Sequence, residues 1–584
     1  MTPAASATAG SNALVAKGLR QRMAWLHTWC GLWISWLLFA IFLTGTLAVF
    51  EEPITHWMTP EHHADEAAAR LRNDVAPAVS RSQRLAYAAA YMAAHHPDAG
   101  MWELWPSDAH GKGSLTAFWL NEDRHYERAQ LSPTTGVRMD AGAQEATTGS
   151  PARATFGGHH FVDFHYTLHG KDVGLWAVAI TTVAMLVALV SGVITHKRIF
   201  KDFFTFRPGK GQRSWLDAHN AVAVLSLPFQ FMIAFTGLVF SAEVYLPASV
   251  WAHYGTDATA RTRYTTDLSD PGVPRRSDIP LAVPDLEPFA ARAEALMGQP
   301  VRAVVIDQPG DAAMRIGVYG WNDDEDVTRR LTPTTGRVSF SAATGDLLSV
   351  RMPGAVDGGA PIRTRAIMGN LHMAGFGGDA IRWLYFIAGA AGAAMMATGA
   401  LLFAVKRRTS SLQEFGDATA HVYRAIDALN LAAIAGLGIA CTAYLWANRL
   451  VPLGIDHRAL WELRVFFAVW ALSLVHACMR PTGRAWVEQM TVLAVLCLAL
   501  PLLNAVVTGN HLVAHIHEGD WESAGVEGMA VLIGMLASWA AWRVRRRPVD
   551  RKQGRAGYVY RGQRARQPEA GRQEGSGRHG RSVS

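Results

Sequence analysis

Eight apolar stretches constrain the fold of this chain more than any other feature of its sequence. Each is long enough to cross a lipid bilayer, which requires about 20 predominantly apolar residues. A chain within lipid must satisfy its backbone polar groups internally, so apolar runs of this length predict helices. The stretches are residues 25–50, 172–196, 216–243, 380–405, 422–447, 459–479, 486–508 and 523–542. We therefore expect a mainly α-helical membrane protein, whose last four helices form an additional membrane region over residues 422–542.

Lysine and arginine are concentrated in the segments that would share one side of the membrane. These segments are residues 1–24, the basic loop 197–215, the loops that begin at 406 and at 480, and the tail 543–584. The tail, which we expect to be disordered, contains 13 Lys+Arg against 3 Asp+Glu, more than the surplus of +7 of the whole chain. The positive-inside rule then places both termini in the cytoplasm of a bacterial-type cell, with the protein in the inner membrane. Membrane orientation explains the positive charge, and no nucleic-acid partner is expected.

Two long segments, 51–170 and 244–379, are then expected in the periplasm. Each shows a helical pattern followed by strand-like alternation, at 82–94, 101–105 and 114–120 in the first and at 285–297, 301–306 and 313–319 in the second. A similar turn sequence follows in both, LSPTTG at 131–136 and LTPTTG at 331–336. Proline early in the turn and a following glycine are typical of turns between strands. Each segment is therefore predicted to form an α+β domain.

The membrane helices also contain a repeat that is marked by histidines. His27 precedes a Thr-Gly pair by 17 residues, and His219 precedes another Thr-Gly pair by the same 17 residues. Both helices run from the inside to the outside, so the two histidines are expected at one depth on the cytoplasmic side. The 17 residues rise about 26 Å, close to the thickness of the hydrocarbon core.

The second and fourth helices match in the same way. A Leu-His pair opens each of them, which places His169 and His372 at one depth on the periplasmic side. His165 lies one helical turn before His169 and is an alternative to it. His196, at the end of the second helix, is a further candidate on the inner side. Small residues close the apolar part of the repeated helices at Gly45, Gly192, Gly237 and Gly399, and helix packing is the favoured explanation for them over room for a flat cofactor.

Histidines are costly within a membrane and tend to mark functional sites there. Neutral imidazole is a good axial ligand of haem iron, and two imidazoles from neighbouring helices can hold one haem between them. The repeat predicts two such haem b sites, with iron ligands His27 and His219 on the inner side and His169 and His372 on the outer side. A haem with both axial positions occupied transfers electrons, so the sequence favours electron transport across the membrane. No catalytic residue is assigned.

At this point the sequence resembles the PepSY-associated transmembrane family over roughly residues 20–410. The resemblance is most specific in the loop HKRIFKDFFTFRPGKGQRSWLDAH at 196–219, and the PTTG turns are similar as well. That family includes haem-containing inner-membrane reductases of ferric siderophores. The resemblance implies a PepSY fold for the two outer segments, haem between histidines, and reduction of a ferric siderophore or another iron chelate at the periplasmic face. The histidines that match the family are His27, His169, His196, His219 and His372, without a fixed pairing.

The chain departs from shorter members of that family after about residue 410, where four further helices follow. His511 and His515 in this region have the i, i+4 spacing of a metal site. The sequence contains neither a dinucleotide-binding fingerprint nor a P-loop. The electron donor of a haem oxidoreductase would therefore be a quinol or a separate flavoprotein. An iron-chelate permease subunit and a non-catalytic PepSY scaffold or regulator are the alternative functions.

Overall fold

The structure is a computed structural model of the full chain. It describes residues 5–61, 79–107, 115–120, 126–138, 153–195, 212–257, 260, 263–264, 276–321, 331, 335–355, 359–410 and 418–546. His196, most of the basic loop 197–215 and the tail beyond 546 lie outside the described residues.

Within the described residues, eight helices are long and apolar enough to cross a membrane, which confirms the prediction. The spans are Gly18–Ala48, Lys171–Thr195, Leu216–Phe240, Gly378–Val405, Thr419–Leu450, Arg458–Met479, Thr482–Thr508 and Trp521–Arg545. They belong to α1 (Ala5–Ala48), α7 (Lys171–Thr195), α9 (Gln212–Phe240), α16 (Gly378–Ser410), α17 (Thr419–Leu431) with the π-helical turn Ala432–Gly436 and α18 (Leu437–Leu450), α19 (Arg458–Met479), α20 (Thr482–Thr508) and α22 (Trp521–Arg545).

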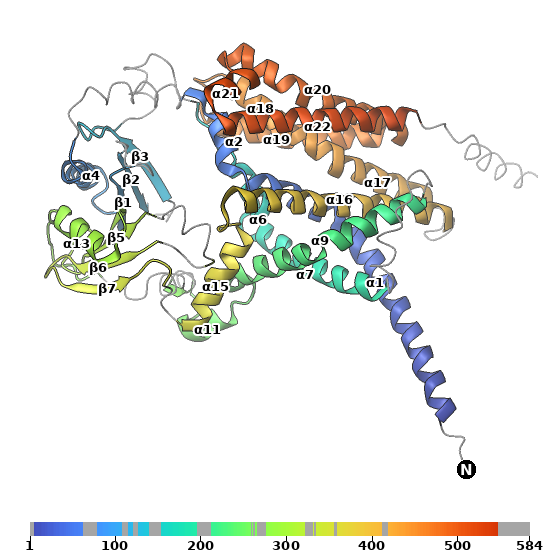
Figure 1. The fold of residues 1–584 in the computed structure, drawn as a ribbon, viewed down its shortest axis with the longest axis horizontal. Coiled ribbons are helices and arrows are strands. Elements are labelled where there is room, and N and C mark those ends of the chain that lie inside the picture. The colour runs from blue at the N-terminus through green and yellow to red at the C-terminus, as the bar shows by residue number, and fades with distance from the viewer. Residues whose placement is uncertain are drawn as a thin grey trace, which may run out of the picture.

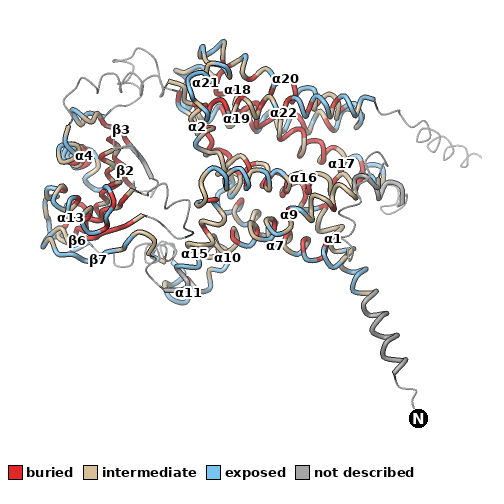
Figure 2. Tube along the Cα trace, viewed as in Figure 1, coloured by how far each residue is buried: buried red, intermediate tan, exposed pale blue. Residues whose placement is uncertain are grey.

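The spans form two neighbouring groups, α1, α7, α9 and α16 in one and α17 to α22 in the other (Figure 1). In the first group, α1 packs against α7 and α16, and α9 packs against α16. The span Thr419–Leu450 lies between the groups, and 78% of its apolar window is buried, whereas no other span exceeds 44%. Figure 2 shows this burial as a red core that continues from one group into the other. The other spans expose apolar side chains, as helices in lipid do.

Among the residues that the structure describes, one antiparallel sheet lies at one end of the helices, away from the start of α1 (Figure 1). Its seven strands have the order β3-β2-β1-β4-β5-β6-β7. The strands are β1 (Met101–Trp105), β2 (Leu115–Leu120), β3 (Tyr126–Leu131), β4 (Val301–Asp307), β5 (Arg315–Gly320), β6 (Arg337–Ser341) and β7 (Leu347–Arg351). The first three strands come from one predicted outer segment and the last four from the other.

The two outer segments therefore share one sheet, where the sequence led us to expect two separate domains. Strand β1 pairs with β4, with Trp102 opposite Ile306. Helices α4 (Arg81–His95) and α13 (Glu287–Met297) cover the same face of this sheet, and Arg81 of α4 binds Glu287 of α13 at 2.6 Å. Because β1 pairs with β4, neither strand is left as an open edge, as it would be if each segment formed a small sheet of its own.

The predicted turn at 131–136 is present after β3, and Gly136 has φ +71°, a conformation that favours glycine. In the second copy, residues 332–334 lie outside the described part of the chain. Trp102 and Trp119 are 2% and 3% exposed and belong to the core between the sheet and its helices.

Short helices connect the spans to the sheet. They are α2 (Glu51–Met58), α6 (His159–Thr167), α10 (Ala242–Tyr245), α11 (Ala248–Tyr254) and α15 (Gly359–His372). In the second group, the short helix α21 (Leu512–Glu518) connects α20 to α22. Helices α6 and α15 immediately precede α7 and α16, so each repeat ends in a short helix followed by a membrane span.

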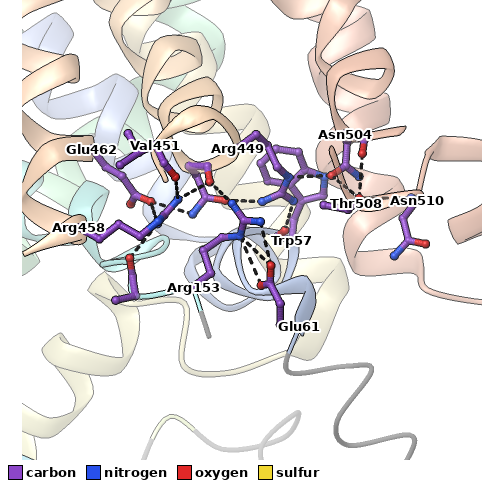
Figure 3. Close-up of polar contacts among 12 residues, drawn as sticks. Trp57, Glu61, Arg153, Arg449, Val451, Arg458, Glu462, Asn504, Thr508 and Asn510 are labelled. Carbon is purple, nitrogen blue, oxygen red and sulfur yellow. Dashed lines mark hydrogen bonds and ion pairs between the residues drawn. The ribbon is translucent and has the colours of Figure 1, made fainter. Parts of the chain in front are cut away.

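Buried arginines join the second group to the first at the end that carries the sheet (Figure 3). Arg449 of α18 donates to the Trp57 carbonyl of α2 and to Asn504 Oδ1 at 2.7 Å. Arg458 of α19 binds Glu462 at 2.6 Å, and both side chains are almost fully buried. Arg153 binds Glu61 at 2.8 Å. Buried charges of this kind are tolerated only when they are paired and hydrogen-bonded, and we define Arg153, Arg449, Arg458 and Glu462 as the arginine junction.

Candidate functional site

His27 and His219 face each other at the end of the first group that lies away from the sheet. His27 belongs to α1 and His219 to α9, and their ring centroids are 6.4 Å apart, with the planes inclined by 58°. The two helices are the equivalent first helices of the two repeats. The structure thus brings together the two histidines that the sequence assigns to the inner site.

His165 and His372 form a second facing pair nearer the sheet. Their ring centroids are 6.0 Å apart and the planes are inclined by 31°. His165 belongs to α6, and His372 is the last residue of α15, so this pair also joins equivalent elements of the two repeats.

The predicted pairing of His169 with His372 is therefore corrected. Helix α6 ends before His169, because Leu168 and His169 both adopt left-handed backbone conformations, with φ of 53° and 55°. This turn directs the His169 ring to His160, whose Nδ1 lies 2.9 Å from His169 Nε2. His165, one turn earlier and weighed in the sequence as the alternative, takes the position opposite His372.

Each of the four facing histidines is anchored in the same way through Nδ1, which lies within hydrogen-bond distance of a backbone carbonyl on a neighbouring helix. The distances are 2.8 Å from His27 to Ala188, 2.8 Å from His165 to Ile41, 3.1 Å from His219 to Met395 and 3.0 Å from His372 to Ile233. Because a carbonyl oxygen only accepts hydrogen bonds, the Nδ1 of each ring carries the proton. In the neutral ring the lone pair is then on Nε2, the form that binds a metal.

A glycine follows each accepting carbonyl by four residues and lies beside the anchored ring. These are the four glycines that the sequence singled out and assigned to helix packing. A Cβ on Gly45 would lie 2.5 Å from His165 Nδ1, and one on Gly237 would lie 2.7 Å from His372 Cε1. The corresponding distances are 3.0 Å from Gly192 to His27 and 3.2 Å from Gly399 to His219. The glycines therefore make room for the imidazole rings.

The two pairs lie at different depths of the first group. His27 lies on α1 near one end of the span, and Ile41, whose carbonyl anchors His165, lies 14 residues further along the same helix. Fourteen residues correspond to about 21 Å of helix. The four histidines thus define two separate sites along one axis.

Burial affects the protonation of the pair nearer the sheet, whose residues lie outside the membrane spans. Burial, and to a smaller extent the neighbouring His165, lower the pKa of His372 to about 4. The pKa of His165 is lowered as well, mainly by burial. Both rings are consequently neutral near pH 7, as metal ligation requires.

The spacing of the pairs fits a metal ion bound between the two rings. Two imidazoles that bind one iron, with metal–nitrogen bonds of about 2 Å, have ring centroids about 6 Å apart. The observed separations are 6.4 and 6.0 Å. The donor set, the fixed tautomers and the glycine cradles are all compatible with a bis-histidine haem at each site.

The histidines of the additional helices have other contacts. His511 caps α21 by accepting a hydrogen bond from the Ala514 amide, and His515 lies 3.2 Å from Asp520. His476 lies 2.9 Å from Glu488. Among the described residues, no three His, Cys, Asp or Glu side chains are grouped as a metal-ion site. Of the two histidines with i, i+4 spacing, His511 thus forms a helix cap and His515 contacts a carboxylate.

Eight spans, two histidine pairs and a seven-stranded sheet at one end define a multi-pass membrane protein with an α+β domain. The family model of the PepSY-associated TM region matches residues 24–406, and the chain belongs to this family. An uncharacterized protein of Pseudomonas aeruginosa is 26% identical over 406 residues, which cover 65% of this chain and 93% of the relative. The family match ends before α17, so the second group of helices lies outside it.

Proposed function

We propose that this protein carries electrons across the bacterial inner membrane on two b-type haems. His27 and His219 would hold the inner haem, and His165 and His372 the outer one. When bound, the haems would supply one-electron carriers at two depths of a membrane that otherwise blocks electrons. The observation that carries this proposal is the paired arrangement of the four rings, each anchored through Nδ1 and each beside a glycine.

The protein's own residues would keep the ligands in place. The carbonyl acceptors fix the tautomer and the orientation of each ring, so that Nε2 remains available for iron. With two protein ligands for each haem, the iron would have no site for substrate, which would favour electron transfer over oxygen chemistry. Exposed apolar side chains on the spans support membrane lipid as the surrounding medium.

We further propose a ferric siderophore or another iron chelate as the acceptor on the sheet side. Reduction would convert the chelated Fe(III) to Fe(II) with one electron, and oxygen ligands hold Fe(II) less strongly. Arg302 lies 4.4 Å from the Trp105 ring and 5.6 Å from the Trp321 ring. Such a cationic and aromatic group suits an anionic chelate. The donor on the cytoplasmic side would be a quinol or a flavoprotein.

An optical spectrum of the purified full-length protein tests the electron-transfer proposal. Reduced-minus-oxidised haem bands should be present, with two haems per chain. After anaerobic reduction, a ferric siderophore should reoxidise the haem while an Fe(II) chelator traps the product. A protein without haem would contradict electron transfer, whereas an intact haem spectrum without reoxidation by any ferric chelate would exclude iron reduction alone.

A further inference from the structure

Two histidines and three carboxylates alternate in one series within the second helix group, at the end of that group that lies on the side of the sheet. His56 of α2 lies 3.5 Å from Glu522 through Nδ1 and 3.1 Å from Asp520 through Nε2. His515 of α21 lies 3.2 Å from Asp520 through Nδ1 and 3.8 Å from Glu527 of α22 through Nε2. Each imidazole thus contacts a different carboxylate through each of its nitrogens.

The series leads from the protein surface to its interior. The exposed fraction of the side chain is 52% for Glu522, 28% for His56, 23% for Asp520, 6% for His515 and 0% for Glu527. Imidazole can accept a proton on one nitrogen and release one from the other, and a carboxylate can do so through its two oxygens. The order of these groups is therefore suited to proton movement between the surface and Glu527.

The buried end of the series has spare capacity for a proton. Glu527 Oε1 accepts hydrogen bonds from Trp57 at 3.1 Å and from Asn504 at 2.8 Å, while Oε2 has no hydrogen-bond partner among the described residues. Both nitrogens of His515 lie within ion-pair distance of carboxylates but outside hydrogen-bond geometry. A proton on the unpartnered Oε2 would remove the buried negative charge, which is costly to hold away from water.

Other charged groups also face Glu527. Arg449 of α18 lies close enough to interact electrostatically with it and shares the neighbour Asn504 of α20. Arg449 also holds the Trp57 carbonyl of α2, within the arginine junction of Figure 3. From the remaining packed elements, His56 of α2 and His515 of α21 belong to the series itself. Glu527 is thus linked to the contacts that join α2 to the second group.

We propose that this series is a proton relay and that Glu527 is its buried proton-binding site. A proton that enters at Glu522 or His56 passes through Asp520 to His515 Nδ1, and His515 releases its Nε2 proton to Glu527. The net change is one proton gained by Glu527 and one lost by the solution on the sheet side. No redox partner is needed, and the inference does not depend on the proposed haem sites.

Time-resolved infrared spectroscopy of the full-length protein in detergent tests the relay. A laser-induced pH drop should produce a protonated-carboxyl band that Glu527→Gln lacks. His515→Phe should retain the band but slow its appearance about 100-fold, because a positioned proton carrier has been removed. His517→Phe is the matched control, since His517 is exposed on the same helix, and its rate should equal that of the wild type.

Two results would overturn the relay. Identical difference spectra for the wild type and Glu527→Gln would show that Glu527 takes up no proton. An unchanged rate in His515→Phe would show that protons reach it by another route. If His515→Phe does not fold, Asp520→Asn replaces it, because asparagine can still cap α22 through Ser523 but cannot carry a proton. This variant should slow the band to a similar degree.

Discussion

The His165 and His372 rings face each other at 6.0 Å, although 207 residues separate them in the chain. Each is anchored by a carbonyl of a first helix of a repeat, at Ile41 of α1 for His165 and at Ile233 of α9 for His372. Each histidine is thus anchored within its own repeat, and the outer site depends on both repeats because each contributes one of the two rings. A change in either repeat should therefore affect the same site.

Removal of His165 should abolish one of the two proposed haems. His165→Ala deletes a ligand but leaves His27 and His219 untouched, so about half of the bound haem should remain. His169→Ala is the matched control, because His169 contacts His160 and not His372. Haem content per chain and a redox titration of each variant measure the effect. Full haem content in His165→Ala, with loss in His169→Ala, would restore the pairing expected from the sequence.

Gly45→Ala should displace the His165 ring. The added Cβ would lie 2.5 Å from Nδ1, which no real contact allows, so the ring must move and the outer haem should be lost or shifted in potential. Gly31→Ala on the same helix is the control, since no described atom lies within 4 Å of its Cβ. Alanine favours a helix by about 1 kcal/mol over glycine, so the control should be as stable as the wild type or more so. Equal haem spectra for both variants would contradict the cradle.

The depths of the histidines were predictable from the sequence, but their partners were not fully so. The 17-residue spacing and the repeat identified His27 and His219, because a straight helix converts sequence distance into depth. The same reasoning failed at His169. Its position depends on a left-handed turn at two non-glycine residues, which local sequence does not favour.

Contacts between distant segments explain most of the remaining differences. The strands were predictable from alternation, yet the pairing of β1 with β4 depends on the packing of segments about 200 residues apart. A small residue within a membrane helix can border either another helix or an imidazole ring, and the sequence does not distinguish the two. The role of the glycines at 45, 192, 237 and 399 was therefore not predictable. The contact of Arg449 with Trp57 could not be foreseen, because no spacing rule connects the two residues.

The orientation of the membrane spans can be tested at the turn after β3. Basic residues in the loops and tail predict that the sheet is periplasmic. An alkaline phosphatase reporter inserted after Gly136, in the exposed turn, should be active, and one fused after Arg545 should be inactive. Activity at Arg545 without activity at Gly136 would invert the proposed topology and place the iron-chelate surface inside the cell.

The arginine junction should contribute strongly to stability. Arg458→Ala leaves Glu462 buried without its charged partner, at 0% exposure, and a broken buried ion pair costs about 3–5 kcal/mol. Arg464→Ala, which removes an exposed arginine from the same helix, should change stability by about 0.5 kcal/mol or less. Reversible unfolding in mixed detergent micelles measures the difference. Equal stability of the two variants would show that the junction does not hold the helix groups together.

Acid should weaken the contact between α6 and the second group through His160. Burial, and to a smaller extent the neighbouring His169, lower the pKa of this histidine to about 3. The unfolded chain binds a proton on this histidine near pH 6.5, whereas the folded chain does not. The contribution of the neutral His160 to the free energy of unfolding is therefore fully present above pH 6.5 and is lost as the pH is lowered toward 3. The slope for one group is about 1.4 kcal/mol per pH unit. His160 is surrounded by aromatic rings, including those of Phe466 and Tyr444.

His160→Phe should therefore remove this component of the pH dependence while retaining the packing. Unfolding free energies measured between about pH 7 and about pH 5 should fall less steeply for the variant than for the wild type. His159→Ala is the control, because His159 is largely exposed and its pKa is raised, mainly by Glu51. A histidine with a raised pKa stabilises the protein at low pH, so its removal should make the acid loss steeper. Parallel pH profiles for the wild type and His160→Phe would show that His160 is not held in its neutral form.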